Sequence, residues 1–204
     1  MNISNNSTLI ILDWDDTLFP TSWVNKNNIE IMNNNKIIYK KYFEKIDLMV
    51  LKMFKILVKY GDVLIITNAL LNWIEISSRI IPLTNNFMKN RNDIKIVSAR
   101  GEYSSVTDNL MDWKKMAFQN ELTNITKNKK INNIISVGDA EYEYHALLNL
   151  YHGEEDNYRL LKSVKFLRYP NNQQIFEQVH ILNNAIHNIC THTGHLDLRI
   201  SNLS

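Results

Sequence analysis

Residues 9–18 of the chain read LIILDWDDTL, and this stretch decides the fold. Four apolar residues, 9–12, run without a break into Asp13. A continuous apolar run without polar alternation is typical of a strand buried on both faces, as in a parallel sheet. Such sheets bind ligands at the carboxyl ends of their strands. The carboxylates of Asp13, Asp15 and Asp16 therefore fall where a ligand site is expected.

Further apolar segments alternate with longer stretches of helical periodicity. The expected strands are residues 9–13, 62–67, 94–98, 134–137 and 164–169. The expected helices are residues 38–60, 70–81, which stops before Pro82, 108–125, 141–150 and 174–189. Strands that alternate with helices imply right-handed crossovers. The sequence therefore predicts an α/β fold with a doubly wound, parallel, Rossmann-like sheet of five strands.

Length and composition indicate one domain. The chain has 204 residues, 45% of them hydrophobic and 22% charged, which is enough for one packed core. Five Gly and three Pro exclude a collagen-like or a Pro/Gly-rich disordered chain. No linker or repeat divides it. We expect a single domain over residues 1–204, with a flap or minimal cap at residues 19–35.

Charge and cysteine content bear on partners and compartment. A net charge of +2 neither demands nor excludes nucleic acid. The single Cys190 cannot form an intrachain disulfide, which favours a reducing compartment. The first residues lack a basic region and the apolar run of about 7 to 15 residues of a signal peptide. We therefore expect a soluble, intracellular, cytoplasmic protein without a membrane partner.

The acidic turn after the first strand carries the first candidate chemistry. Carboxylates this close repel one another, and a bound divalent cation commonly offsets the repulsion, although a solvated acidic turn or a helix cap is the alternative. Asp13, Asp15 and Thr17 resemble the first motif of the haloacid dehalogenase-like superfamily, Asp-x-Asp-x-Thr after a hydrophobic strand. The resemblance implies that Asp13 is the nucleophile, that Asp15 is general acid and then general base, and that Thr17 binds phosphate.

The second expected strand ends in Thr67 and Asn68. This resembles the second motif of the superfamily, a strand-terminal Thr or Ser. A hydroxyl beside free N–H groups at a helix N-terminus is suited to a phosphate group. The resemblance assigns both residues to phosphate binding, and the alternative is that Thr67 is only a helix cap.

The third motif is a basic residue, for which Lys114 and Lys115 compete. At 100° per residue, Lys114 falls near the centre of the apolar face of the helix at 108–125, and Lys115 lies about 100° further round. A lysine in that place suits a balance of Asp13 and an incoming phosphate, although a structural ion pair is the alternative. Lys114 is therefore the expected catalytic and phosphate-binding lysine.

A Gly-Asp pair ends at Asp139, with Glu143 four residues later, and resembles the last motif. Magnesium prefers oxygen ligands, commonly one or two carboxylates with phosphate oxygens and water. The resemblance implies one Mg²⁺ held by Asp13, Asp15, Asp139 and Glu143. The family more often has Asp at the last position, so Glu141 is an alternative ligand.

Together, the motifs indicate a magnesium-dependent phosphatase of the haloacid dehalogenase-like superfamily, in its capless or minimally capped branch. It would hydrolyse phosphomonoesters through an aspartyl-phosphate. The substrate would be a phosphorylated small molecule, a phosphoprotein or a nucleic-acid end. The alternative function is a non-catalytic module that binds phosphate or nucleic acid. A dehalogenase would not need Asp15 or the metal acids, and a phosphonatase would need a lysine on a cap.

There is little sequence for a cap. About 45 residues separate Thr17 from the second strand, and the helix at 38–60 is needed there as the crossover. We expect an open pocket with Phe19 and Trp23 of the flap near its entrance. The alternative is that both are packing residues and that a second copy, in a homodimer, supplies the lid.

The C-terminal region contains three His near Cys190, within residues 187–195. Structural zinc sites favour paired Cys or His at short fixed spacings, and a lone Cys is more often a small buried hydrophobe, so no zinc site is assigned. Within the tail at 192–204, apolar and polar residues alternate over 196–200. That alternation fits either a short edge strand or a dimer contact.

Overall fold

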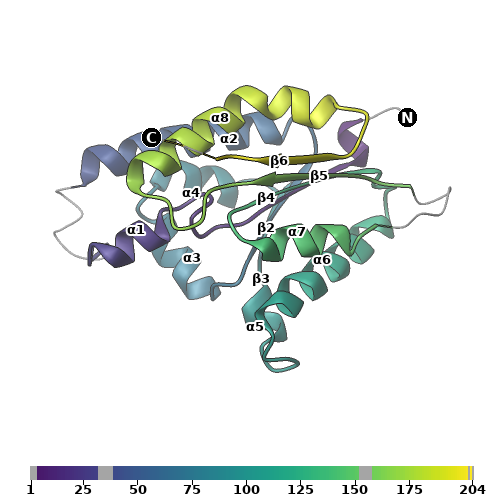
Figure 1. Ribbon diagram of the computed structural model, residues 1–204, viewed down its shortest axis with the longest axis horizontal. Coiled ribbons are helices and arrows are strands. Elements are labelled where there is room, and N and C mark those ends of the chain that lie inside the picture. The colour runs from purple at the N-terminus through teal and green to yellow at the C-terminus, as the bar shows by residue number, and fades with distance from the viewer. Residues whose placement is uncertain (1–3, 32–38, 152–157, 202, 204) are drawn as a thin grey trace.

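The computed structural model describes residues 4–31, 39–151, 158–201 and 203. Its elements, in chain order, are η1 (Asn5–Ser7), β1 (Thr8–Leu12), α1 (Thr21–Lys26), α2 (Lys40–Leu57), β2 (Asp62–Thr67), α3 (Leu71–Ser78), α4 (Pro82–Lys89), β3 (Ile94–Ser98), α5 (Ala99–Tyr103), α6 (Leu110–Thr126), β4 (Asn133–Gly138), α7 (Glu141–Leu148), β5 (Leu160–Lys165), α8 (Asn172–Thr191) and β6 (Leu196–Arg199). The six strands form one parallel sheet in the order β3-β2-β1-β4-β5-β6 (Figure 1). The fold is α/β and Rossmann-like.

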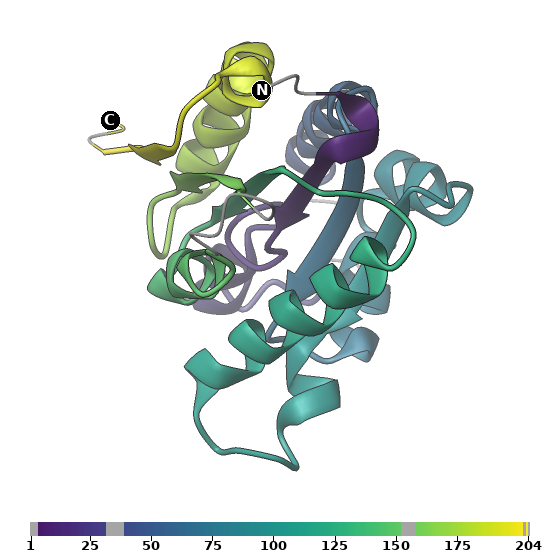
Figure 2. The same ribbon diagram turned by 90° about the vertical axis from the view of Figure 1, so that its right-hand side faces the viewer.

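Helices cover both faces of the sheet, with α2 and α8 on one face and α6 and α7 on the other (Figures 1 and 2). Successive side chains of β1 point to opposite faces. Ile10 and Leu12 join the core under α2 and α8, whereas Leu9 and Ile11 join the core under α6 and α7. Burial on both faces explains why this strand has no polar alternation.

The order of the strands sets the place of a ligand site. From β1 the chain runs outward through β2 to β3 at one edge, and it then returns to β4 on the other side of β1. Doubly wound sheets bind ligands outside the carboxyl ends of their strands, at such a reversal. Asp13 follows β1 and Asp139 follows β4, so both acids lie at the reversal.

The sheet differs from the expected one at its far edge. The fifth strand is Leu160–Lys165, not residues 164–169. Lys162 interrupts the apolar run that would have marked its start, yet this lysine is fully buried. Its Nζ donates to the carbonyl oxygens of Ile189 and Cys190, at 2.8 and 3.1 Å, near the end of α8, where backbone carbonyls lack helical partners. A sixth strand, β6, pairs with β5 in parallel, so this part of the tail is an edge strand.

The expected helix at residues 70–81 is followed by a second helix that the sequence did not reveal. α3 ends at Ser78, and Pro82 is the first residue of α4 rather than a stop. Proline suits this position because the first helical N–H needs no intrahelical partner. Asp47 of α2 accepts the N–H groups of Leu83 and Thr84 at 2.9 and 2.8 Å, which satisfies the start of α4.

The remaining predicted helices are confirmed within three residues at each end, as α2, α6, α7 and α8. α1 and α5 have six and five residues, too few to show a periodic pattern. None of the helices in the described ranges has the length and apolarity needed to cross a bilayer.

The aromatic residues of the expected flap are packing residues. Phe19 is fully buried and stacks between Trp14 and Phe43, with ring centroids 6.4 and 6.1 Å apart, so it does not line an entrance. Trp23 packs against Tyr39 and Tyr42 at 5.2 and 4.8 Å. The expected flap at 19–35 is therefore represented by α1 and the turn after it, and its residues 32–35 lie outside the described residues.

Candidate active site

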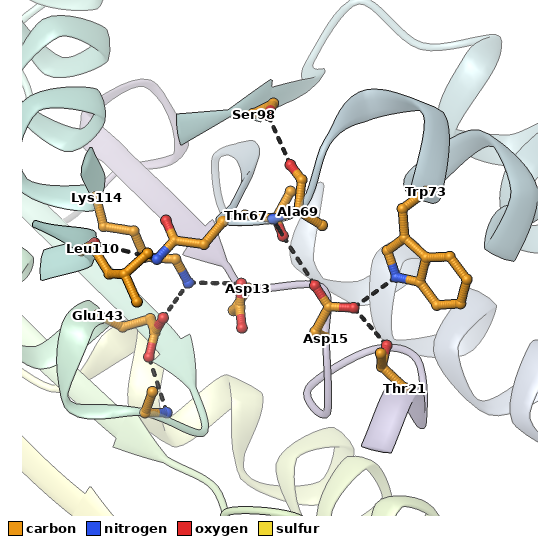
Figure 3. Close-up of polar contacts among 12 residues, drawn as sticks. Asp13, Asp15, Thr21, Thr67, Ala69, Trp73, Ser98, Leu110, Lys114 and Glu143 are labelled. Atoms are coloured by element: carbon orange, nitrogen blue, oxygen red, sulfur yellow. Dashed lines mark hydrogen bonds and ion pairs between the residues drawn. The ribbon is translucent and has the colours of Figure 1, made fainter. Parts of the chain in front are cut away.

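Lys114 joins two acidic side chains at the carboxyl ends of β1 and β4 (Figure 3). Its Nζ donates to Asp13 Oδ1 at 2.6 Å and also to Glu143 Oε1. Burial alone would lower the pKa of Lys114, but the charges of Asp13 and Glu143 raise it above its ordinary value. Lys114 points inward as the helical geometry predicts, whereas Lys115 pairs with Asp112 near the surface.

Glu143 lies directly against Gly138. Its Oε2 accepts the N–H of Ala140 at 3.0 Å, which caps the first turn of α7. A Cβ atom on Gly138 would come within 2.3 Å of Glu143 Cγ. Glycine is needed here because a side chain would push the carboxylate away from Lys114.

The acids of the site outweigh its buried lysine. Burial raises the pKa of Asp13 well above its ordinary value, and the opposing charge of Lys114 does not cancel this effect. Glu143, Asp139 and Asp15 raise the pKa of Asp13 further. Burial likewise raises the pKa of Asp139 to about 7, with the charge of Glu143 adding to the effect. The site therefore has more acidic groups than Lys114 can balance, and the raised pKa values favour the protonated forms of Asp13 and Asp139 when no cation is bound.

A tight turn follows Asp13 and carries the other acids. The N–H of Asp13 bonds to the carbonyl oxygen of Val137 at 2.9 Å, which ties the end of β1 to β4. Asp16 has a φ of 54°, in the left-handed region, which a short polar side chain tolerates better than most. Its carboxylate accepts the N–H of Ser22 at 2.8 Å and also the Ser22 hydroxyl, which anchors α1 to the turn.

Asp15 lies on the other side of Asp13 from Lys114 and accepts three hydrogen bonds (Figure 3). Trp73 Nε1 and Thr21 Oγ1 donate to Asp15 Oδ1 at 2.7 and 2.5 Å. Thr67 Oγ1 donates to Asp15 Oδ2 at 3.2 Å. The predicted acid/base residue is thus in contact with one predicted phosphate-binding residue and with two side chains that the sequence did not indicate.

The three predicted phosphate-binding positions outside Lys114 occupy different surroundings. Thr67 ends β2, and its Oγ1 accepts the N–H of Ala69 at 2.9 Å, so it also caps the following turn. Asn68 donates from Nδ2 to the carbonyl oxygen of Leu110 at 3.3 Å. Thr17 is fully buried, and its hydroxyl is without a hydrogen-bond partner among the described residues. Buried hydroxyls normally have partners, so this one is a candidate ligand contact.

The donor set fits a magnesium ion. Asp13 and Asp139 offer two carboxylates at neighbouring strand ends, and both have pKa values raised by burial and by neighbouring acids. A divalent cation would return both to their ionised forms. Glu143 is the expected ligand that fits least well, because Lys114 and the Ala140 N–H already engage its two oxygens.

The alternative metal ligand also has partners of its own. Glu141, the alternative ligand, pairs with Lys165 and also lies 3.7 Å from Arg199. Within the described part of the chain, no three His, Cys, Asp or Glu side chains are arranged to hold a metal by themselves. In the C-terminal His/Cys region, the Tyr60 hydroxyl is hydrogen-bonded to His187 Nδ1 at 2.8 Å. Burial raises the pKa of the Cys190 thiol to about 12, which disfavours the thiolate that a metal would need.

Comparison of the chain with protein-family models, with curated proteins and with solved structures finds no match. The family resemblance therefore depends on the four sequence motifs. The function has to be argued from the geometry of Asp13, Lys114 and the side chains around them.

We expect the acidic cluster to make the metal-free protein sensitive to pH. The folded-state pKa of Asp139, about 7, lies above the unfolded value, so this group destabilises the fold as pH rises from about 4 to 7. Asp139→Asn should therefore gain stability relative to wild type between pH 5 and pH 8, by up to about 4 kcal/mol. Urea unfolding of both proteins in EDTA measures the gain, and a stability difference that is independent of pH contradicts the account.

Proposed function

We propose that the chain is a magnesium-dependent phosphohydrolase with a haloacid dehalogenase-like fold, which cleaves phosphomonoesters through an aspartyl-phosphate on Asp13. The observation that carries the proposal is the contact between Lys114 Nζ and Asp13 Oδ1, at 2.6 Å, at the reversal of strand order. A buried lysine beside a strand-end carboxylate can balance negative charge that develops there during phosphoryl transfer. The further acid on the neighbouring strand, Asp139, supports a cation in the same site.

In the first half of the proposed reaction, a carboxylate oxygen of Asp13 attacks the phosphorus atom. The bond from phosphorus to the ester oxygen breaks, and Asp15 gives its proton to that oxygen. Lys114 lies against Asp13, where it can balance negative charge on the transferring phosphoryl group. Thr67 and Asn68 lie at the end of β2 and would bind phosphate oxygens from that side.

In the second half, water attacks the phosphorus atom of the aspartyl-phosphate. Asp15 accepts a proton from that water, and the bond from phosphorus to the Asp13 oxygen breaks. Inorganic phosphate leaves and the Asp13 carboxylate is restored. The two halves return both acids to their starting protonation states.

A magnesium ion, when bound, supplies positive charge that offsets the phosphate and the acids of the site. Its protein ligands would be the carboxylates of Asp13 and Asp139 and the backbone carbonyl oxygen of Asp15. Glu143 holds Lys114 in place through their contact and would contribute to the ion only through a bridging water.

The described residues between Thr17 and β2 hold only α1 and α2, and those from Asn68 to Lys114 hold α3, α4, β3, α5 and the start of α6. Neither stretch has a cap domain in the described ranges. This supports a site that takes a bulky phosphate, such as a phosphoprotein or a nucleic-acid end, because the described part of these stretches has no separate cap to enclose a small ligand.

A Mg²⁺-dependent hydrolysis screen tests the proposal. The substrates are phosphosugars, nucleotides, phosphopeptides and oligonucleotides with 5′- or 3′-phosphates. We expect phosphate release in Mg²⁺, with kcat/KM highest for a macromolecular substrate. A kcat/KM above about 10⁵ M⁻¹s⁻¹ for a small metabolite, with slow cleavage of peptides and oligonucleotides, contradicts the bulky-substrate part. Binding of phosphate esters without release contradicts the hydrolase itself and favours a non-catalytic module.

A further inference from the structure

The two oxygens of the Asp15 carboxylate have different surroundings (Figure 3). Oδ1 accepts from Trp73 Nε1 at 2.7 Å and from Thr21 Oγ1 at 2.5 Å. A carboxylate oxygen has about two lone-pair directions, so these donors fill both. Oδ2 accepts the longer bond from Thr67, at 3.2 Å, and has no second donor among the described residues.

We propose that Trp73 and Thr21 are positioning residues that hold Oδ1 of Asp15, so that Oδ2 is the atom that gives and takes the catalytic proton. This inference rests on the proposed phosphatase function. Oδ2 qualifies because only one of its lone-pair directions has a donor among the described residues and because it contacts Thr67, a predicted phosphate-binding residue. Oδ1 would have to give up one of its two short hydrogen bonds before it could carry the proton, because the proton takes one of its two lone-pair directions.

Both donors are themselves held by neighbouring contacts. Trp73 belongs to α3, and its ring packs edge-on against the buried Phe19 with centroids 6.0 Å apart. Thr21 begins α1, and the next residue, Ser22, is bonded to Asp16 in the turn that carries Asp15. Donors on anchored helices hold a carboxylate in one orientation without a cost at the moment of reaction.

The proton transfer in the first half-reaction predicts how loss of the Trp73 and Thr21 hydrogen bonds should affect the hydrolysis of different phosphate esters. In the first half, the Oδ2 proton moves to the ester oxygen as its bond to phosphorus breaks. A p-nitrophenolate leaving group is stable without that proton, whereas an alkoxide leaving group needs it. A misplaced Asp15 should therefore impair alkyl phosphates far more than p-nitrophenyl phosphate.

The test compares kcat/KM of Trp73→Phe and Thr21→Val on the best alkyl phosphate from the screen and on p-nitrophenyl phosphate. Phe keeps the contact with Phe19, and Val keeps the shape of Thr21, but each lacks the donor. We expect losses of about 10- to 100-fold on the alkyl ester and less than about threefold on the aryl ester. The control Trp23→Phe, on a tryptophan that packs away from Asp15, should change neither. Equal losses on both esters, or no loss on either, overturn the proposal.

A second readout does not depend on turnover. The indole N–H resonance of Trp73, identified by its disappearance in Trp73→Phe, should move more than those of Trp14, Trp23 and Trp113 when Asp15 is changed to Asn. An unmoved resonance overturns the hydrogen bond even if the enzyme is active. If the resonance moves in Asp15→Asn but the wild-type protein cleaves no phosphate ester, the hydrogen bond stands and the proposed function is refuted, together with the catalytic role of Trp73.

Discussion

Asp13→Asn should lower phosphatase activity by at least about 10³-fold while the protein stays folded. The amide has the shape of the carboxylate but lacks the charge that attacks phosphorus. Its carbonyl oxygen can still accept the hydrogen bond from Lys114 Nζ, so the contact between Lys114 and Glu143 should survive. Because burial raises the pKa of Asp13, a neutral side chain there should not destabilise the fold.

Asp62→Asn is the matched control for that experiment. Asp62 begins β2, at the amino end of the sheet, and pairs with Lys129 there. The same chemical change at the opposite end of the sheet should leave kcat/KM within about twofold of wild type, because it is remote from the site. It should also leave the protein folded, since ion pairs near the surface contribute little to stability. Retention of more than a tenth of the wild-type rate by Asp13→Asn would end the assignment of Asp13 as nucleophile.

Removal of divalent metal should abolish turnover, and added Mg²⁺ should restore it. Without the cation, Asp13 and Asp139 share a buried site with raised pKa values, so the nucleophile is not fully ionised and the phosphate is repelled. Steady-state rates in EDTA, followed by Mg²⁺ or Zn²⁺ titration, measure the dependence. Full activity in EDTA, or restoration by zinc alone, contradicts a magnesium site.

Two variants separate the candidate ligands. Asp139→Asn should raise the Mg²⁺ concentration needed for half-maximal rate by at least about tenfold, since it removes one of two carboxylates. Glu141→Gln should change that concentration by less than about threefold, because Glu141 is engaged with Lys165 and lies partly exposed. A larger effect from Glu141 would make it a metal ligand in place of Glu143.

Much of the fold could be predicted because burial leaves a pattern in the chain. The uninterrupted apolar run before Asp13 identified a strand covered on both faces, and the apolar face of α6 identified Lys114 as the buried lysine of the pair. Both inferences used periodicity, which reports what a side chain packs against. The proximity of Asp13 and Asp139 also followed, since strand ends of a parallel sheet meet at one edge.

Features that depend on a single long-range contact left no such pattern. Lys162 looked like a break in a strand because the carbonyl groups that accept its hydrogen bonds lie on α8. Pro82 looked like a stop because Asp47, which caps the helix after it, comes 35 residues earlier. Trp73 lies 58 residues after Asp15 in the sequence, and Thr21 is a common residue type at the start of α1. Only their hydrogen bonds to Asp15 identify them as residues of the site.

Trapping the phosphorylated enzyme tests the central claim most directly. The wild-type protein is mixed with Mg²⁺ and the best substrate of the screen, stopped in acid, and treated with borohydride, which converts an aspartyl-phosphate to homoserine. Mass spectrometry of the peptide that contains residues 9–18 should then show homoserine at position 13, and the Asp13→Asn protein should show none. A reduced residue at any other position, or turnover by the wild type without a trapped Asp13, would contradict the account.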